Sequence, residues 1–319
     1  MQLDSTRIAV RERSLPEVFD LALHVTREFA GPWLLCSLLA IVPLALINYA
    51  LIGWMTNLDY DTDFPGFRFA WNMLLLIFIE APLASAFVVA YLGPAVFREQ
   101  KSIRQVVADV FRFRRARPDD TRPIVNLILC QLILRGVLPA WLIYLTLDPL
   151  EFNGFQEGFL LPAIACYSAA MRCFRPYLNE IILLERNPLF SRNPNQITIA
   201  RRSSHLHGPS SSDLFVRWFL SALLGFSLIL LAIFTAEAAV GVLTSMWPVS
   251  IDVANEDFSW NIGWFRLQVL YPLCLWLVVA YFSVVRFLSY LDLRIRHEGW
   301  EVELLMRAEA LRMASKVGV

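Results

Sequence analysis

The sequence predicts an all-α fold: a polytopic transmembrane helical bundle of about six spans, with amphipathic interfacial helices and a C-terminal cytoplasmic helix. Three observations point to this class. Hydrophobic residues make up 57% of the 319 residues and charged residues 18%, a balance that soluble domains seldom show. Long apolar runs recur, each near the roughly 20 residues that cross a hydrocarbon core of about 30 Å. The loops between them alternate between basic and acidic, as in chains that cross a membrane repeatedly.

Periodic apolar runs divide the chain into three parts. A cytoplasmic N-terminus with an amphipathic helix is expected over 1–30, a six-span membrane domain over 31–288 and a cytoplasmic helical tail over 289–319. The N-terminal segment has no apolar core of a signal peptide, so the first run is expected to stay as an anchor. Residues 203–213 are rich in serine and are expected to form a flexible loop. The expected spans lie near 31–55, 69–95, 123–147, 155–184, 213–244 and 264–288.

Two amphipathic segments precede the first and third spans and share one design. Each begins with a capping box, in which a serine and a Glu or Gln three positions later satisfy each other's backbone N–H groups. Apolar residues then recur at helical spacing and form a one-sided stripe, which suits a helix lying in the cytoplasmic membrane interface. The similarity indicates either a repeated unit or two amphipathic helices alike by chance. The segments are 14–29, with Ser14 and Glu17, and 102–117, with Ser102 and Gln105.

The charge distribution predicts orientation. Arginine and lysine gather in the N-terminal segment, in the loops after the second and fourth spans and in the tail, whereas the opposite loops are acidic. The positive-inside rule then places both termini in the cytoplasm. The basic residues are expected to contact anionic lipid headgroups, each contributing about 1 kcal/mol near the surface, rather than nucleic acid. The candidate headgroup contacts are Arg104, Arg112, Arg114, Arg115, Arg294 and Arg296.

Ionisable residues within the spans form a candidate intramembrane polar network. Such residues are costly at membrane depth and need partners, so they indicate either an ion pair that fixes helix register or a substrate or proton site. Glu80 and Arg135 lie at similar depth in consecutive spans and are expected to pair. The candidate network comprises Glu80, Arg135, Arg172, Arg175, Glu180 and Glu237.

Proline interrupts most of the spans. Each proline lacks an N–H, breaks one helical hydrogen bond and can kink the helix. Kinks near Pro82 and Pro176 could expose backbone carbonyls to a cavity, as in transporters, although proline is also common in membrane helices that transport nothing.

No enzymatic motif is present in the sequence. The H-E-x-x-H, G-x-S-x-G and G-x-x-x-x-G-K-[ST] patterns are absent, so we expect no enzyme, no metal and no cofactor. Metal binding by His205, His207 and Asp213 is not expected, because these residues fall in the expected flexible loop. The cysteines all lie in apolar runs and are expected to be small buried hydrophobes: Cys36, Cys130, Cys166, Cys173 and Cys274.

Several short motifs carry a resemblance. The span with Glu80-Ala81-Pro82, the stretch RPYLNE over 175–180 with LER over 184–186, and YLDLRIR over 290–296 resemble an uncharacterised group of bacterial six-span membrane proteins. The organisation is also similar to the membrane domain of some bacterial glycerophosphodiester phosphodiesterases. The resemblance implies a multi-pass protein of the bacterial inner (plasma) membrane. We expect the catalytic domain to be absent, because 319 residues leave no room for it, so no catalytic residue carries over.

These observations favour a non-enzymatic inner-membrane protein, a scaffold or accessory subunit of an envelope-associated assembly. Its partners would be membrane lipids, through anionic headgroups on the cytoplasmic side, and proteins docking on 97–122 and 289–315. The alternative is a transporter or lipid-handling protein with a charged intramembrane cavity. A third possibility is a lipid-active enzyme whose site has no sequence signature.

Overall fold

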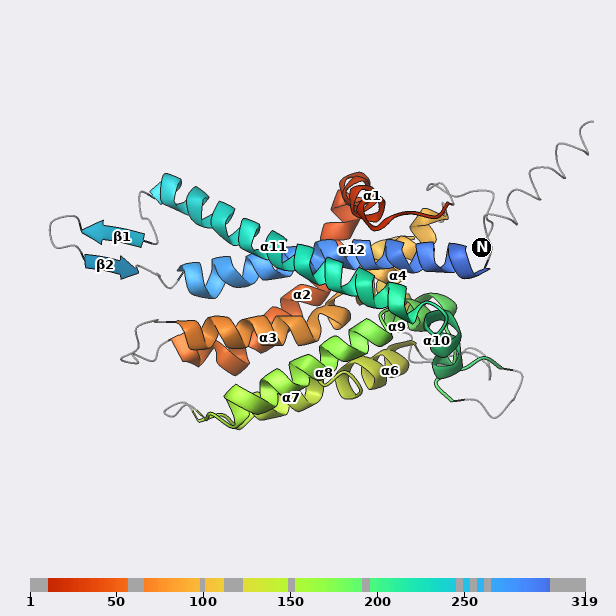
Figure 1. Cartoon of the computed structure of the whole chain (residues 1–319), viewed down its shortest axis with the longest axis horizontal. Coiled ribbons are helices and arrows are strands. Elements are labelled where there is room, and N and C mark those ends of the chain that lie inside the picture. Colours follow the sequence, from red (N-terminus) through yellow and green to blue (C-terminus); the bar gives the residue numbers. More distant parts are fainter. Residues whose placement is uncertain are drawn as a thin grey trace, which may run out of the picture.

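The structure, a computed structural model, is a bundle of long helices in the part of the chain that it describes (Figure 1). The helical class expected from the sequence is confirmed, although two short strands are also present. A β-hairpin marks one end of the bundle and helix α10 the other, and these are called the hairpin end and the α10 end below. The described residues are 11–56, 66–97, 101–111, 123–148, 153–190, 196–244, 249–252, 257–260 and 265–298.

Four helices are long and apolar enough to cross a membrane. A 3-10 turn directly follows the first of them, a π segment directly precedes the last, and the second is divided only at Ser85 (Figure 1). The four are α2 (Ala30–Ile52) with η2 (Gly53–Thr56), α3 (Phe67–Ala84) with α4 (Ala86–Val96), α11 (Ser211–Thr244), and η6 (Arg266–Leu270) with α12 (Tyr271–Glu298).

The third expected span is bent by 59° between Val125–Ile133 and Val137–Leu145. The bend lies at Gly136, which has a positive φ of 82° that residues with a side chain rarely adopt. A Cβ added there would also lie 2.8 Å from a methyl group of Ile164. If the bent pair is one span, five helices can cross a membrane. The segments are α6 (Pro123–Leu127), η3 (Ile128–Ile133) and α7 (Val137–Leu145).

The fourth expected span, 155–184, is broken rather than continuous. Pro176 has no N–H to continue the helix and pushes the preceding residue out of the helical region, and Arg175 has φ −137° and ψ 64°. The count of six spans therefore stays a prediction. The pieces are η4 (Gln156–Leu160), α8 (Leu161–Phe174), α9 (Leu178–Glu180) and η5 (Ile181–Glu185).

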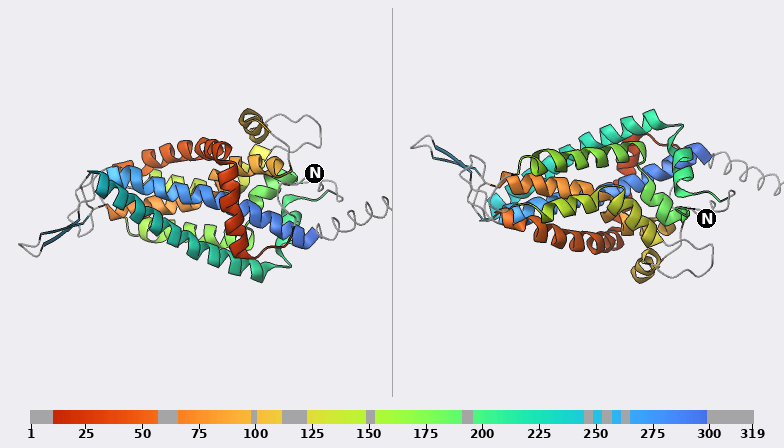
Figure 2. Two further views of the ribbon diagram at one scale, coloured as in Figure 1. Left: turned by 90° about the horizontal axis from the view of Figure 1, so that it is seen from above. Right: turned by 90° about the horizontal axis from the view of Figure 1, so that it is seen from below.

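Both predicted capping boxes are present. The backbone N–H of Ser14 donates to Glu17 at 2.8 Å and that of Ser102 donates to Gln105 at 2.9 Å. They begin α1 (Leu15–Glu28) and α5 (Ile103–Val110). Helix α1 crosses the bundle at a steep angle to the long helices, as Figure 2 shows, and buries its apolar stripe, including Val18 1% exposed and Ala22 0%.

The expected flexible loop over 203–213 is wrong. Helix α10 (Ile199–His207) occupies its first part, and α11 begins at Ser211. The Thr198 hydroxyl caps α10 by accepting from the N–H of Arg201 at 3.4 Å. Burial of the helix's apolar face, including Leu206, outweighs the loop-like composition.

The strands and the tail complete the description. Strands β1 (Val249–Asp252) and β2 (Asp257–Trp260) pair antiparallel beyond α11. Helix α12 carries the chain through Glu298. Residues 299–319, which the tail prediction included, lie outside the described residues, as do Arg112, Arg114 and Arg115.

Candidate functional site

An arginine of α8 donates hydrogen bonds to backbone carbonyls of α3, one of which lacks its helical partner. Pro82 has no N–H for the carbonyl of Phe78, four residues earlier. The Arg172 guanidinium donates to this carbonyl and, at 3.2 Å, to the carbonyl of Ile79. It also lies 4.1 Å from the centre of the Phe78 ring. The proline thus creates the acceptor that holds Arg172 in place.

Polar side chains continue from these carbonyls toward the α10 end. The Asn179 amide donates to the Pro82 carbonyl and, at 3.0 Å, to the Ser85 hydroxyl, and it accepts from Gln131. The Ser85 hydroxyl also donates to the Pro82 carbonyl at 2.8 Å. The Pro82 carbonyl at the end of α3 is therefore satisfied by side chains.

Glu180 and Arg286 form the ion pair of this region. Glu180 is fully buried, and Arg286 of α12 approaches it at 3.0 Å while donating to Ser85 at 3.2 Å. Glu180 is a member of the predicted network, whereas Arg286 is not among the predicted residues. The signal was available, since Arg286 is an arginine inside the sixth apolar run.

The expected pair between Glu80 and Arg135 is wrong. Glu80 accepts from the Asn48 amide at 2.8 Å and the Trp141 indole at 2.7 Å. The fully buried Arg135 donates to the carbonyl of Arg175 at 3.0 Å. The breaks at Gly136 and before Pro176 turn Arg135 toward a freed carbonyl, a geometry that span depth alone does not reveal.

The remaining candidates lie apart from this cluster. The Arg175 side chain is exposed, and only its backbone carbonyl takes part. Glu237 of α11 pairs with Arg266 of η6 at 3.1 Å. The structure therefore unites three of the six expected residues, Arg135, Arg172 and Glu180, and adds Arg286. We call these four residues the arginine cluster.

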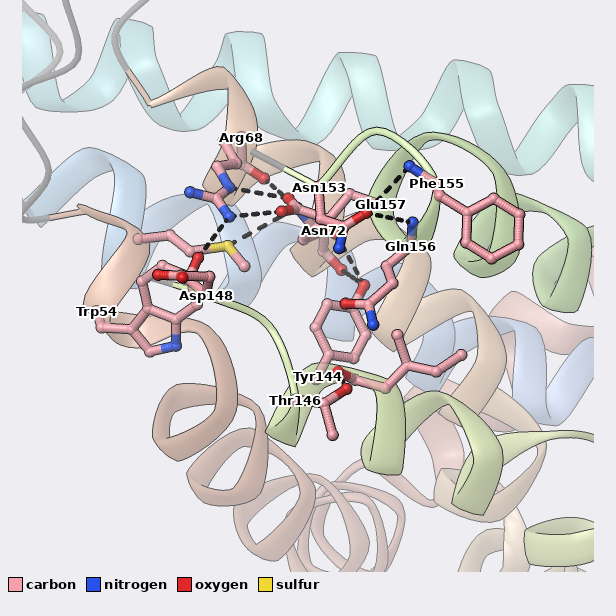
Figure 3. Close-up of polar contacts among 12 residues, drawn as sticks. Trp54, Arg68, Asn72, Tyr144, Thr146, Asp148, Asn153, Phe155, Gln156 and Glu157 are labelled. Atoms are coloured by element: carbon pink, nitrogen blue, oxygen red, sulfur yellow. Dashed lines mark hydrogen bonds and ion pairs between the residues drawn. The ribbon is translucent and has the colours of Figure 1, made fainter. Parts of the chain in front are cut away.

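A second polar network, absent from the prediction, joins side chains of α3, α7 and η4 (Figure 3). The Arg68 guanidinium donates to the buried Glu157 carboxylate at 2.8 Å and lies 5.1 Å from the centre of the Trp54 ring. Asn72 donates to the same carboxylate at 3.3 Å and accepts from the Tyr144 hydroxyl at 3.0 Å. We call Arg68, Asn72, Tyr144 and Glu157 the Arg68 network.

A cavity of about 560 Å³ lies between α3, α8, α11 and α12, next to the arginine cluster. Its volume is in the range of small-molecule sites. The wall is mostly apolar, and part of it reaches the surface, since Trp71 is 40% exposed and Phe226 59%. The polar groups on the wall are Ser85, Arg172, Tyr177, Arg217, Ser221, Ser283, Arg286 and Ser289.

The three arginines on this wall differ in their partners. Arg217 pairs with Asp292 at 2.8 Å and with Asp213 at 2.9 Å, and Arg286 pairs with Glu180. Arg172 contacts only backbone carbonyls and the Phe78 ring within the described part of the chain, where its buried Nε has no hydrogen-bond partner. One cation of the wall thus lacks a carboxylate there.

Charged residues at the α10 end pair with one another. Arg202 contacts Glu185 at 2.6 Å, and Arg294 contacts Glu298 at 2.6 Å. Arg296 contacts Asp292 at 3.1 Å. The candidate headgroup contacts Arg294 and Arg296 are therefore engaged in ion pairs, whereas Arg104 is exposed on α5.

His207 of α10 is buried against the cavity wall. Its ring lies 5.7 Å from that of Tyr177, and Ser203 contacts its Nδ1 at 3.1 Å. Burial first, and then the positive charge of Arg175, lower the pKa of His207 to about 4. The imidazole is therefore neutral at physiological pH.

Thiols and metal ligands add little to the site. Cys36, Cys130, Cys173 and Cys274 are free and buried as expected, but Cys166 is exposed and lies on the cavity wall. No group of three or more His, Cys, Asp or Glu side chains in the described ranges is arranged to hold a metal ion.

No protein-family model matches this chain, and neither a curated protein nor a solved structure matches it.

Proposed function

We propose that this chain is an integral membrane protein that handles lipids by binding an anionic amphiphile in the cavity between α3, α8, α11 and α12. The observation that carries the proposal is the pairing state of Arg172, which faces a largely apolar cavity without a carboxylate partner in the described residues. An arginine in a medium of low dielectric is stabilised strongly by an anion that forms charge-assisted hydrogen bonds with it.

The shape of the cavity supports an amphiphile rather than a small polar anion. Its wall follows α3 from Trp71 to Ser85, and these fourteen steps correspond to about 21 Å of helix. This length exceeds one leaflet, which is half of a hydrocarbon core of about 30 Å. The arginines and hydroxyls gather at the Ser85 side, while Trp71, Leu74 and Leu275 leave the other side apolar. An acidic headgroup and a hydrocarbon chain would each meet a matching surface.

The position of α11 supports exchange with the surrounding lipid. None of its most apolar stretch is buried inside the protein, yet Ser221, Gly225 and Ile229 line the cavity. A ligand that slides in beside α11 would enter directly from the bilayer, without crossing water.

The topology belongs to the same proposal. Both termini would lie in the cytoplasm of a bacterial cell, and the broken segment from Gln156 to Glu185 would complete a sixth span of the inner membrane. The headgroup side of the cavity would then face the cytoplasmic leaflet. The scaffold role stays a prediction, because the surfaces 97–122 and 289–315 are described only in part.

Lipid analysis of the purified protein tests the proposal. The chain would be extracted in dodecyl maltoside, and its bound lipids would be compared by mass spectrometry with those of the source membrane. We expect enrichment of anionic lipid on the wild type and its loss in Arg172→Gln. Arg175→Gln is the matched control, because this arginine lies three residues away with an exposed side chain. Identical lipid in all three proteins, at bulk membrane composition, would contradict the proposal.

A further inference from the structure

We infer that the cavity selects an amphiphile whose headgroup is a phosphate monoester carrying two negative charges. This inference rests on the proposed function and narrows the ligand class. It follows from the charge balance of the arginine cluster and from the hydrogen-bond donor that Arg172 leaves unused at the cavity wall.

The arginine cluster holds three cations and one carboxylate. Glu180 is bound by Arg286 at 3.0 Å, while Arg135 and Arg172 donate to backbone carbonyls. Both Arg135 and Arg286 lie near enough to Arg172 for their charges to act on it. Among the described residues, the cluster therefore has two positive charges in excess.

The neighbouring carboxylates do not cancel this excess. Arg217 and Arg296 are matched by Asp213 and Asp292, which makes that group neutral. Glu80 has its two oxygens occupied by Asn48 and Trp141, and no described hydrogen bond or ion pair joins it to the arginine cluster. A dianion in the cavity would restore neutrality where low dielectric makes a net charge most costly.

The unused donor of Arg172, together with hydroxyl groups on the same wall, indicates an acceptor-rich headgroup. The buried Nε of Arg172, and the buried Nε and Nη1 of Arg135, have no hydrogen-bond partner within the described chain. Arg172 lies on the cavity wall with the hydroxyls of Ser85 and Ser289, whereas Arg135 lies behind the wall and contributes its charge. A phosphate monoester presents three strong acceptor oxygens and a charge of about −1.5 to −2 at neutral pH. Diesters and carboxylates carry a single charge.

A matched series of single-chain ligands tests the inference on the full-length wild type in dodecyl maltoside. Labelled tetradecyl phosphate would be displaced by unlabelled tetradecyl phosphate, its methyl ester, tetradecanoate, tetradecyl phosphocholine and inorganic phosphate. At about pH 8 we expect tetradecyl phosphate to bind about tenfold more tightly than its methyl ester or tetradecanoate. At about pH 5 the preference over the methyl ester should vanish, because the second phosphate ionisation lies at about pH 6 and both ligands then carry one negative charge.

Three arginine variants test whether the charges of the arginine cluster determine ligand affinity. Arg172→Gln should weaken binding of every anionic ligand, and Arg175→Gln should leave the whole series unchanged. Arg135→Gln should weaken binding of tetradecyl phosphate more than that of tetradecanoate, and so reduce the preference for the monoester, because the charge of Arg135 acts on two negative charges in one ligand and on one in the other. The wild-type series decides the question even if a variant fails to fold.

Each of the other possible results of the displacement experiment would contradict a particular part of the inference. Equal affinity for the three anionic amphiphiles at about pH 8 would refute the dianion and leave the proposed lipid-binding function standing. Displacement by inorganic phosphate as strong as that by tetradecyl phosphate would show that the hydrocarbon chain of the ligand contributes nothing to its affinity, and would refute an amphiphile as the ligand. Failure of every anionic ligand to bind would refute the inference and the proposed function together.

Discussion

The Arg68 network and the arginine cluster are both polar regions inside a largely apolar bundle, and they are balanced differently. In the Arg68 network one arginine meets one buried carboxylate, and Asn72 and Tyr144 occupy further hydrogen-bonding positions (Figure 3). The arginine cluster has three cations for one carboxylate and borders a cavity of about 560 Å³. The first arrangement pairs its charges within the described protein and is assigned a role in stability, whereas we propose that a ligand completes the second.

The comparison teaches where intramembrane charge indicates function. Depth in the span did not separate the two regions, because both contain a buried acid and an arginine from different helices. The two regions differ in whether each hydrogen-bond donor has an acceptor, and each charge an opposite charge, within the described protein.

The largest effect is expected from breaking the Arg68 network. Glu157→Ala removes the buried carboxylate that the guanidinium of Arg68 contacts, and the Arg68 side chain is only 12% exposed. The free energy of unfolding should fall by about 3–5 kcal/mol. Reversible unfolding in mixed micelles measures the change, and the double variant Arg68→Met with Glu157→Leu should recover much of it. An unchanged stability of Glu157→Ala would remove the structural role assigned to this network.

Acidification should act on the arginine-cluster side of the molecule instead. The pKa of His207 is lowered from 6.5 to about 4 in the folded protein, so the neutral ring is favoured by folding. This contribution is complete above about pH 6.5, is lost as the pH falls toward 4, and amounts to at most about 3 kcal/mol.

Thermal unfolding of wild type and His207→Gln between about pH 7.5 and pH 4 checks this expectation. The difference between the two proteins isolates the histidine from carboxylates that titrate in the same range. Parallel pH profiles would mean that His207 ionises equally well in the folded and unfolded chains.

Replacement of Arg172 should affect binding more than folding. Arg172→Gln keeps a donor for the carbonyl that Pro82 frees, so the free energy of unfolding should change by about 1–2 kcal/mol. Ligand-induced stabilisation by tetradecyl phosphate, measured as a shift in melting temperature, should be lost in this variant and retained in Glu157→Ala. A loss of the ligand-induced shift in both variants would erase the distinction between the two regions.

The smallest effect is expected at a helix cap that belongs to neither region. Ser102→Ala removes the hydroxyl that accepts from the N–H of Gln105 at 3.3 Å. Helix α5 should lose about 1 kcal/mol of local stability, seen as faster amide hydrogen exchange over Ile103–Val110. Ligand binding should not change, and a change would show that α5 communicates with the cavity.

The amino-acid sequence by itself determined the helical class, the apolar segments and the two capping boxes. These properties depend on neighbours close along the chain: Ser14 caps through Glu17, three residues away, and the apolar runs need only length and composition. The positions of Pro82 and Pro176 likewise indicate where α3 is interrupted and where α8 ends, because proline cannot donate a backbone hydrogen bond.

Only the tertiary structure decided which partners these groups meet. Arg172 and Phe78 are separated by 94 residues, and Arg286 and Glu180 by 106, so their pairing depends on how helices pack and bend. The bend at Gly136 turned Arg135 away from the acid expected for it, and burial against the bundle made a helix of residues whose composition indicates a loop. Composition and spacing report local preferences, whereas the balance of charge around a cavity is a property of the packed chain.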